Sequence, residues 1–278
     1  MSILEFTALL LFVAYAAGLL GSLTGLGGGV VLVPALVLLF HVDIHYAMGA
    51  SLISVIATSS GAAAAFVREG YTNLRIGMFL EVGAALGAIA GAFIAALLPA
   101  NVIAVIFGAV LLFSAYLSYR RKEDSEPDRE SHPWAVRLKM EDSYPTPAGP
   151  KAYRVYKVPT GLSLMGAAGV LSGLLGIGSG AVKVLAMDQA MRLPYKVSTT
   201  TSNFIIGITA AASAGIYFSR GYVDPGLTMP VMLGVLLGSL TGAKILVGAR
   251  SEALRLIFSL VILGLAIQMI YQGVFGGH

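Results

Sequence analysis

Ten apolar stretches, divided into two groups of five by a charged segment, constrain the fold of this chain more than any other feature. A helix needs about 17–25 apolar residues to cross the hydrocarbon core of a bilayer, and most of the stretches have that length. The first group covers residues 4–23, 30–40, 47–67, 74–98 and 102–119. The second group covers residues 158–175, 181–191, 197–218, 227–247 and 254–271.

The composition agrees with a chain that lies in a membrane. Hydrophobic residues make up 57% of the chain and charged residues 12%, with a mean hydropathy of +0.84, whereas soluble domains carry about 25% charged residues. The apolar stretches do not alternate with polar residues as barrel strands do, so we expect an all-α polytopic membrane protein. The chain has no cysteine, which excludes disulfides and cysteine nucleophiles. Glu5, with no Lys or Arg before it, argues against a cleaved signal peptide.

The two halves of the chain align without a gap when the sequence is shifted by 151 residues. The shift places identical residues on one another in the pairs Gly18/Gly169, Gly25/Gly176, Gly27/Gly178, Gly29/Gly180 and Ser51/Ser202. It also superimposes two ladders of glycines four residues apart, namely Gly83, Gly87 and Gly91 on Gly234, Gly238 and Gly242. Glycines with this spacing share one helix face and permit close contact, so we expect both ladders to be packing seams.

The positions of Lys and Arg predict how the two copies are oriented. Residues 120–157 carry basic residues next to both flanking stretches, so the segment is expected to be a cytoplasmic linker between two membrane repeats, residues 1–119 and 158–278. Both termini are then outside. The basic loop around Arg68 and Arg75 corresponds to loop 219–226 on the other side, so the repeats are expected to be inverted, with about five helical segments each. Prolines at 127, 133, 145, 147 and 150 predict an irregular linker.

Two glycine-rich turns precede the two shortest apolar stretches. The first turn, in SLTGLGGGVVLVP, contains Gly25, Gly27, Gly28 and Gly29, and the second contains Gly176, Gly178, Ser179 and Gly180. The eleven residues that follow each turn span about 17 Å of helix, so we expect re-entrant or broken helices. Glycine amides at the start of a helix suit an anion. Two alternatives stay open: the glycines only permit tight helix crossing, or the first turn lies near the inner surface because stretch 4–23 spans the bilayer fully.

Lys183 is the ionisable residue of the second short stretch. If Arg192 marks the cytoplasmic surface, Lys183 lies about 14 Å deeper, near the bilayer midplane, where ionisable groups are functional or paired. It replaces Leu32 of the first half, so the fold does not require it. We expect Lys183 to bind an anion, and the alternative is an ion pair with Asp188 or Glu81. Glu81 is itself a candidate for proton coupling.

A run of polar side chains opens the eighth apolar stretch. It consists of Ser198, Thr199, Thr200, Thr201, Ser202 and Asn203, and the equivalent start of the third stretch carries Ser51. Hydroxyl and amide groups coordinate oxyanions, but they also form hydrogen bonds between helices, and the sequence does not separate the two uses.

These motifs resemble the TauE/SafE sulfite exporter family of prokaryotic membrane transporters. The resemblance covers nearly the whole chain and rests on GSLTGLGGGVVLVPAL, GLLGIGSGAVKVL, MGAS, TTTSN and FSRGYVDP. It implies an inner-membrane transporter of sulfite, sulfoacetate or a related sulfur-containing anion, generally outward. It also implies substrate binding at both glycine turns and at the polar starts of the third and eighth stretches. Ser179 and Leu185 depart from the pattern of the first turn, so the second turn is expected to differ in shape.

We therefore expect a secondary transporter that exports a small anion by alternating access. The chain has no Walker A loop, and the membrane potential releases about 2.3 kcal/mol per exported negative charge per 100 mV, which suffices without a coupled ion. Coupling to a proton or sodium stays open, with Glu81 as the candidate carboxylate. The alternatives are a channel or importer for another small anion, and an intramembrane hydrolase in which Ser179 and Lys183, four residues apart, form a nucleophile pair.

No cofactor, metal or nucleic acid enters these expectations. His41 and His45 have a spacing that can share a metal ion, but no third ligand accompanies them, so we interpret them as ordinary loop residues.

Overall fold

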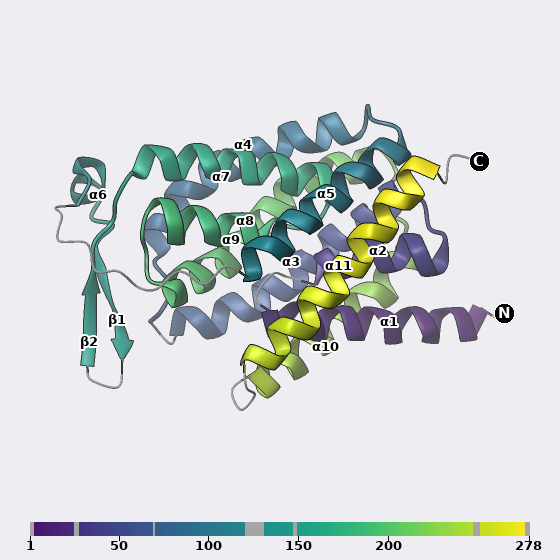
Figure 1. Cartoon of the computed structure of the whole chain (residues 1–278), viewed down its shortest axis with the longest axis horizontal. Helices are drawn as coiled ribbons and strands as arrows, with labels where there is room; N and C mark the ends of the chain where they lie inside the picture. The colour runs from purple at the N-terminus through teal and green to yellow at the C-terminus, as the bar shows by residue number, and fades with distance from the viewer. Residues whose placement is uncertain are drawn as a thin grey trace.

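A computed structural model describes residues 3–24, 28–68, 70–119, 131–146, 149–246 and 251–275 (Figure 1). All ten apolar stretches form helices, as predicted. They are α1 (Ile3–Thr24), α2 (Gly29–Phe40), α3 (Ile44–Arg68), α4 (Leu74–Ala95), α5 (Ala100–Tyr119), α7 (Val158–Leu175), α8 (Gly180–Leu185) with the π-helical turn η1 (Ala186–Ala190), α9 (Tyr195–Ser219), α10 (Pro225–Leu246) and α11 (Ser251–Phe275). Among the described residues, α1, α4, α7, α9 and α10 are long and apolar enough to cross a membrane. The protein is an all-α multi-pass membrane protein.

The two short helices begin where the sequence predicts. Helix α2 has 12 residues and starts at Gly29, and α8 starts at Gly180, has 6 residues and continues as η1. The turns before them differ in shape, as expected from the departure at Ser179: Gly28 has φ −64°, whereas Ser179 has φ 48° in the left-handed region. Gly25 and Gly27 lie outside the described residues.

The helices pair in a reciprocal way. Helix α1 packs along α10 and α4 packs along α7, so the first membrane helix of each repeat contacts the fourth of the other. Helix α3 packs on its own counterpart α9, and α5 packs on its counterpart α11 (Figure 1). A two-fold relation between two copies produces this pattern, because a contact from i to j is then matched by one from j to i.

The glycine ladders form the two large seams, which confirms the packing prediction. A Cβ on Gly87 or Gly91 would meet the backbone of α7 at Gly166 and Val170. In the matching seam, Gly234 and Gly238 approach the α1 backbone from Leu11 to Leu19. The helix axes therefore lie closer together than any side chain would allow.

The loops divide between two ends of the molecule. Helix α4 starts at Leu74, after its N-cap Asn73, which bonds to the linker, and it ends at Ala95, whose carbonyl lies 3.4 Å from His45 Nε2. His45 stacks on Tyr222 at 4.9 Å, so loop 221–224 lies opposite its repeat equivalent, loop 70–73. This placement agrees with the predicted inversion of the repeats.

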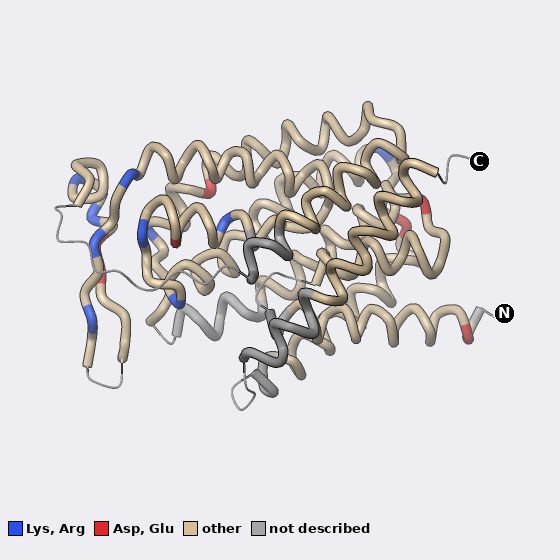
Figure 2. Tube along the Cα trace, in the orientation of Figure 1, with Lys and Arg blue, Asp and Glu red and all other residues tan. Residues whose placement is uncertain are grey.

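The chain ends and the linker also lie at opposite ends of the molecule. Helix α1 begins and α11 ends at the end away from the linker (Figure 1). Most of the Lys and Arg positions that Figure 2 colours lie at the linker end. That this end faces the cytoplasm stays a prediction from the positive-inside rule.

Part of the linker is folded, which corrects the expectation of an irregular segment. Residues 131–157, here called the cap, contain α6 (Pro133–Arg137) and a hairpin of β1 (Asp142–Thr146) and β2 (Gly149–Tyr153). Pro133 fits the first turn of α6, and Pro145 faces Pro150 in a two-stranded sheet, where both strands are edges and tolerate proline. Apolar side chains of the cap share one core with α4, α7, η1 and α9.

Candidate functional site

The two glycine turns meet in the middle of the bundle, between α3 and α9. A Cβ on Gly29 would lie 2.6 Å from Ser51 Oγ and 3.2 Å from the Cα of Ile177, which belongs to the second turn. A Cβ on Gly178 would lie against Val55 of α3 and Ile206 of α9. Gly29 and the second turn thus lie together, and because Gly25 and Gly27 lie outside the described residues, one central site formed by both turns stays a prediction.

Each turn is faced by a serine of its own repeat. Ser202 donates a hydrogen bond to the carbonyl of Gly180 at 3.3 Å, and Ser51 lies beside Gly29, the repeat equivalent of Gly180. Gly176, the left-handed C-cap of α7, contacts Met48 of α3 and leaves no room for a side chain. The structure therefore brings together the site residues Gly28, Gly29, Ser51, Gly176, Gly178, Ser179, Gly180 and Ser202.

Two hydroxyl groups at this meeting point have no hydrogen-bond partner among the described residues. Ser51 is 0% exposed and Ser179 is 3% exposed, and the Oγ atom of each is buried and unpaired. A buried hydroxyl without a partner destabilises a fold by about 1–3 kcal/mol. Unpaired polar atoms in a native core indicate a ligand or water that completes them.

Lys183 lies one helical turn after Ser179 and is fully buried, at 0% exposure. Its Nζ donates to the Thr209 hydroxyl and lies 3.6 Å from Glu81 Oε2. Thr209 in turn donates to the Glu81 carboxylate, at 2.7 Å from Oε1. Of the two acidic partners considered from the sequence, Asp188 and Glu81, the structure pairs Lys183 with Glu81.

Sequence reasoning missed Thr209. Its position carried a usable signal, because Thr209 lies seven residues after Ser202, on the same face of α9, and aligns with Thr58 in the first repeat. Helices α4, α8 and α9 supply one member each of the cluster Glu81, Lys183 and Thr209.

Thr200 and Thr201 of the polar run bond to loop 70–73 and not to the glycine turns. The Thr200 hydroxyl lies 3.1 Å from the Tyr71 carbonyl, and Thr201 Oγ1 accepts a hydrogen bond from the Asn73 amide at 3.1 Å. Asn203 is half-buried, and the hydroxyls of Ser198 and Thr199 are buried without a partner among the described residues. Thr200 and Thr201 thus belong to the cap end, and their predicted role in substrate binding stays a hypothesis.

Asn73 joins three elements at the cap end. Its side-chain Nδ2 donates to the Met140 carbonyl at 2.8 Å and to the Tyr153 hydroxyl at 2.6 Å, and its Oδ1 caps α4 by accepting from the Ile76 amide at 3.0 Å. Burial raises the pKa of Tyr153 to about 12, so this phenol stays protonated at physiological pH.

We expect Asn73→Ala to destabilise the protein, because it leaves the Met140 carbonyl and the Tyr153 hydroxyl unpaired and removes the cap of α4. Each buried group left without a partner lowers the free energy of unfolding by about 1–3 kcal/mol, and the loss of the cap lowers it by about 1 kcal/mol. Thermal unfolding in detergent measures the effect, and Ser163→Ala, at an exposed hydroxyl of α7, is the control. An Asn73→Ala protein that unfolds at the wild-type temperature would contradict this.

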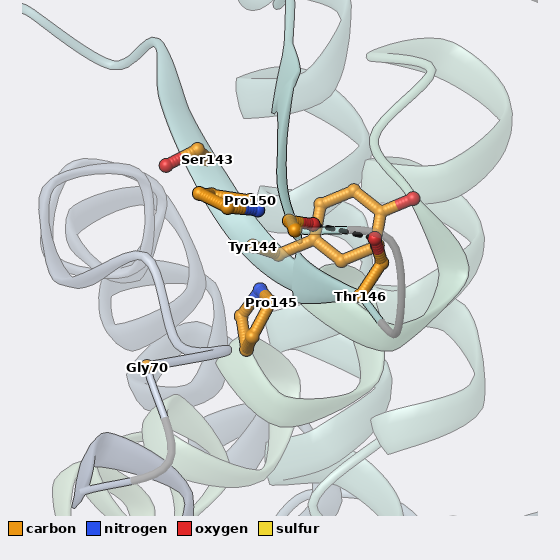
Figure 3. Close-up of a pocket in the computed structure, with 7 residues that line it drawn as sticks. Gly70, Ser143, Tyr144, Pro145, Thr146 and Pro150 are labelled. Atoms are coloured by element: carbon orange, nitrogen blue, oxygen red, sulfur yellow. Dashed lines mark hydrogen bonds between the residues drawn. The ribbon is translucent and has the colours of Figure 1, made fainter.

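An open groove of about 370 Å³ lies between the hairpin and Gly70 (Figure 3). Its lining consists of Gly70, Ser143, Tyr144, Pro145, Thr146, Gly149 and Pro150. None of these described lining residues is charged.

Comparison with known proteins shows the family of the chain. The model of the family "Sulfite exporter TauE/SafE" matches residues 10–269. The chain belongs to the TauE/SafE sulfite exporter family. It is 29% identical over 274 residues to the "Probable membrane transporter protein YunE" of Bacillus subtilis, covering 96% of this chain and 98% of the relative. It is 30% identical over 241 residues to "YdhB" of the same organism, covering 85% and 89%. No solved structure matches the chain significantly.

Membership in the TauE/SafE family makes this chain a membrane transporter and not an enzyme. The alternative of a Ser179–Lys183 hydrolase is therefore wrong. The structure gives the physical reason, since Lys183 Nζ donates to Thr209 and approaches Glu81, whereas Ser179 Oγ has no partner among the described residues.

Proposed function

We propose that this TauE/SafE protein is a secondary transporter that exports sulfite or a small organosulfonate by alternating access. The observation that carries the proposal is the pair of buried hydroxyls of Ser51 and Ser179, which have no partner among the described residues and lie where Gly29 meets the second glycine turn. Both groups are free to donate a hydrogen bond, and the oxygens of a sulfite or sulfonate group are acceptors.

Helix α2, which follows the first glycine turn, adds an electrostatic field that favours an anion. Helix α2 begins at Gly29, and the amides of Val31 and Leu32 donate to the Gly28 carbonyl, so the amides that this proposal offers to a ligand are those of Gly29 and Val30. The positive end of a helix dipole stabilises an anion at such a place. Lys183, one helical turn after Ser179 on α8, adds a cation, whose charge the Glu81 carboxylate offsets while it is ionised.

The helix arrangement is suited to alternating access. The glycine turns lie between α3 and α9, the central pair of equivalent helices, with the α1–α10 and α4–α7 seams to either side. In transporters with inverted repeats the substrate lies at the interface of the repeats, and one group of helices rocks against the other. We assign one rigid group of helices to each seam, α1 with α10 and α4 with α7.

The proposal is tested with purified protein in liposomes loaded with labelled sulfite, taurine or sulfoacetate. We expect saturable efflux of at least one of these sulfur compounds, its loss in Lys183→Ala, and in Ser51→Ala a roughly tenfold higher concentration for half-maximal flux, because one hydrogen bond to a charged group is worth about 1.5 kcal/mol.

Ser60→Ala, at an exposed position of the same helix α3, is the matched control and should transport like wild type. Flux that never saturates would indicate a channel. Flux equal to that of empty liposomes for every sulfur-containing anion would overturn the substrate assignment.

A further inference from the structure

The buried ion pair occurs in one repeat only. Under the shift of 151 residues, Lys183 corresponds to Leu32, Glu81 to Met232 and Thr209 to Thr58. The first repeat thus keeps the threonine and replaces both charged residues with apolar ones. Leu32 is fully buried in the core, so this fold accommodates an apolar side chain at the position of the lysine.

Packing therefore does not explain why the second repeat carries two charges. Removing a lysine and a carboxylate from water is so unfavourable that apolar residues of similar volume are often equally or more stable. The pair is retained at a place where it is nearly inaccessible, with Glu81 4% exposed and Lys183 0% exposed. Intramembrane ionisable groups of this kind mark ion or proton pathways.

The geometry sets Glu81 and a substrate anion in competition for one cation. Lys183 Nζ is 3.6 Å from Glu81 Oε2, and the Thr209 hydroxyl lies between the two groups. While Glu81 is ionised it neutralises Lys183 and repels any second anion. A proton on Glu81 removes that negative charge and leaves the ammonium group of Lys183 to the substrate.

We propose that a proton on Glu81 and an anion on Lys183 occupy the site together, so that the transporter moves one proton with each anion in the same direction. The inference rests on the proposed function and names its coupling ion. For a monovalent anion the loaded site carries no additional net charge. Transport then follows the combined gradient of anion and proton, so export proceeds when the outward anion gradient exceeds the inward proton gradient, and the membrane potential alone does not drive it.

In the part of the chain that the structure describes, few other titratable groups lie on the elements packed against this pair. Helix α7, which packs along α4, has none within Val158–Leu175. On α4, Arg75 donates to the Lys139 carbonyl at the cap end, and on α9, Tyr217 donates to the Gly173 carbonyl. Tyr195 and Lys196 lie at the start of α9, and Asp188 is half-buried in η1, next along the chain from α8.

The test uses labelled methanesulfonate in proteoliposomes, because this sulfonate stays ionised at every pH used and any pH dependence then belongs to the protein. For wild type we expect up to tenfold higher apparent affinity per unit decrease in pH, which is the limit for one bound proton. A pH gradient should drive uptake, and a potassium diffusion potential at equal pH should not.

Three variants separate the roles. Glu81→Gln mimics the protonated carboxyl group, so we expect anion exchange that is retained and independent of pH. The double variant Glu81→Met with Lys183→Leu copies the first repeat and should fold but not bind the anion. Asp188→Asn should keep the wild-type pH slope.

Wild-type flux with no pH slope, or driven by potential alone, would overturn the coupling and leave the proposed function standing. A folded Glu81→Gln protein that keeps the pH slope would do the same. Absence of flux for methanesulfonate and for every other sulfur-containing anion, at every pH, would overturn both.

Discussion

Gly173→Ala is expected to disrupt the α4–α7 seam, although it adds a single methyl group. A Cβ at this position would overlap the backbone of α4 at Ala88, so the two helices would have to separate. Overpacking in a tight core destabilises by about 1–3 kcal/mol, and the loss of the neighbouring contacts along the seam adds to that. The apparent unfolding temperature in detergent, followed by size-exclusion chromatography, measures the effect.

Gly264→Ala is the matched control for this variant. A Cβ on Gly264 of α11 would meet nothing within 4 Å, so the substitution gains the helix propensity of alanine, about 1 kcal/mol, without a clash. Equal unfolding temperatures for the two variants would show that the seam tolerates a side chain and would contradict the prediction.

The single variants of the ion pair are expected to lower the free energy of unfolding, whereas the double variant is expected to leave it unchanged or raise it. Lys183→Leu leaves the Glu81 carboxylate buried with only Thr209 as a partner, and Glu81→Met leaves a buried ammonium group. Breaking a buried pair from one side destabilises by about 3–5 kcal/mol, whereas replacing both members with apolar residues is neutral or stabilising by about 1–4 kcal/mol.

Thermal unfolding of the two single variants and of the double variant measures this difference without any assumption about transport. The double variant should regain at least the stability of wild type. A double variant as unstable as either single one would mean that Leu32 and Met232 are not equivalent to the pair, and the argument from the repeat would fail.

The sequence predicts the helices, the seams and the two broken helices because each rests on a local and duplicated pattern. Apolar length defines the helices, a four-residue glycine spacing defines the seams, and the turn before Gly29 recurs before Gly180. The same 151-residue shift predicts that Ser51 and Ser202 occupy matching places, and both lie beside their own turns.

The partners of individual polar side chains were harder to predict. Consecutive residues on a helix point about 100° apart, so Thr200, Thr201 and Ser202 necessarily face different neighbours, and a run of polar residues does not identify which one reaches the site. The choice of Glu81 over Asp188 depends on how α4 and α8 are rotated, which no local pattern encodes. The folded cap was missed because prolines at sheet edges and at the start of a helix look like breakers in sequence.

The reciprocal seams have a consequence for how this protein is made. Helix α1 is synthesised before its glycine-lined partner α10, which begins only at Pro225. Helix α4 is likewise synthesised before its partner α7. During synthesis the first half therefore enters the bilayer with two backbone-lined helix faces that its own helices do not cover. Neither half is a self-sufficient folding unit, and co-expression of separate halves should restore a protein that either half alone cannot form.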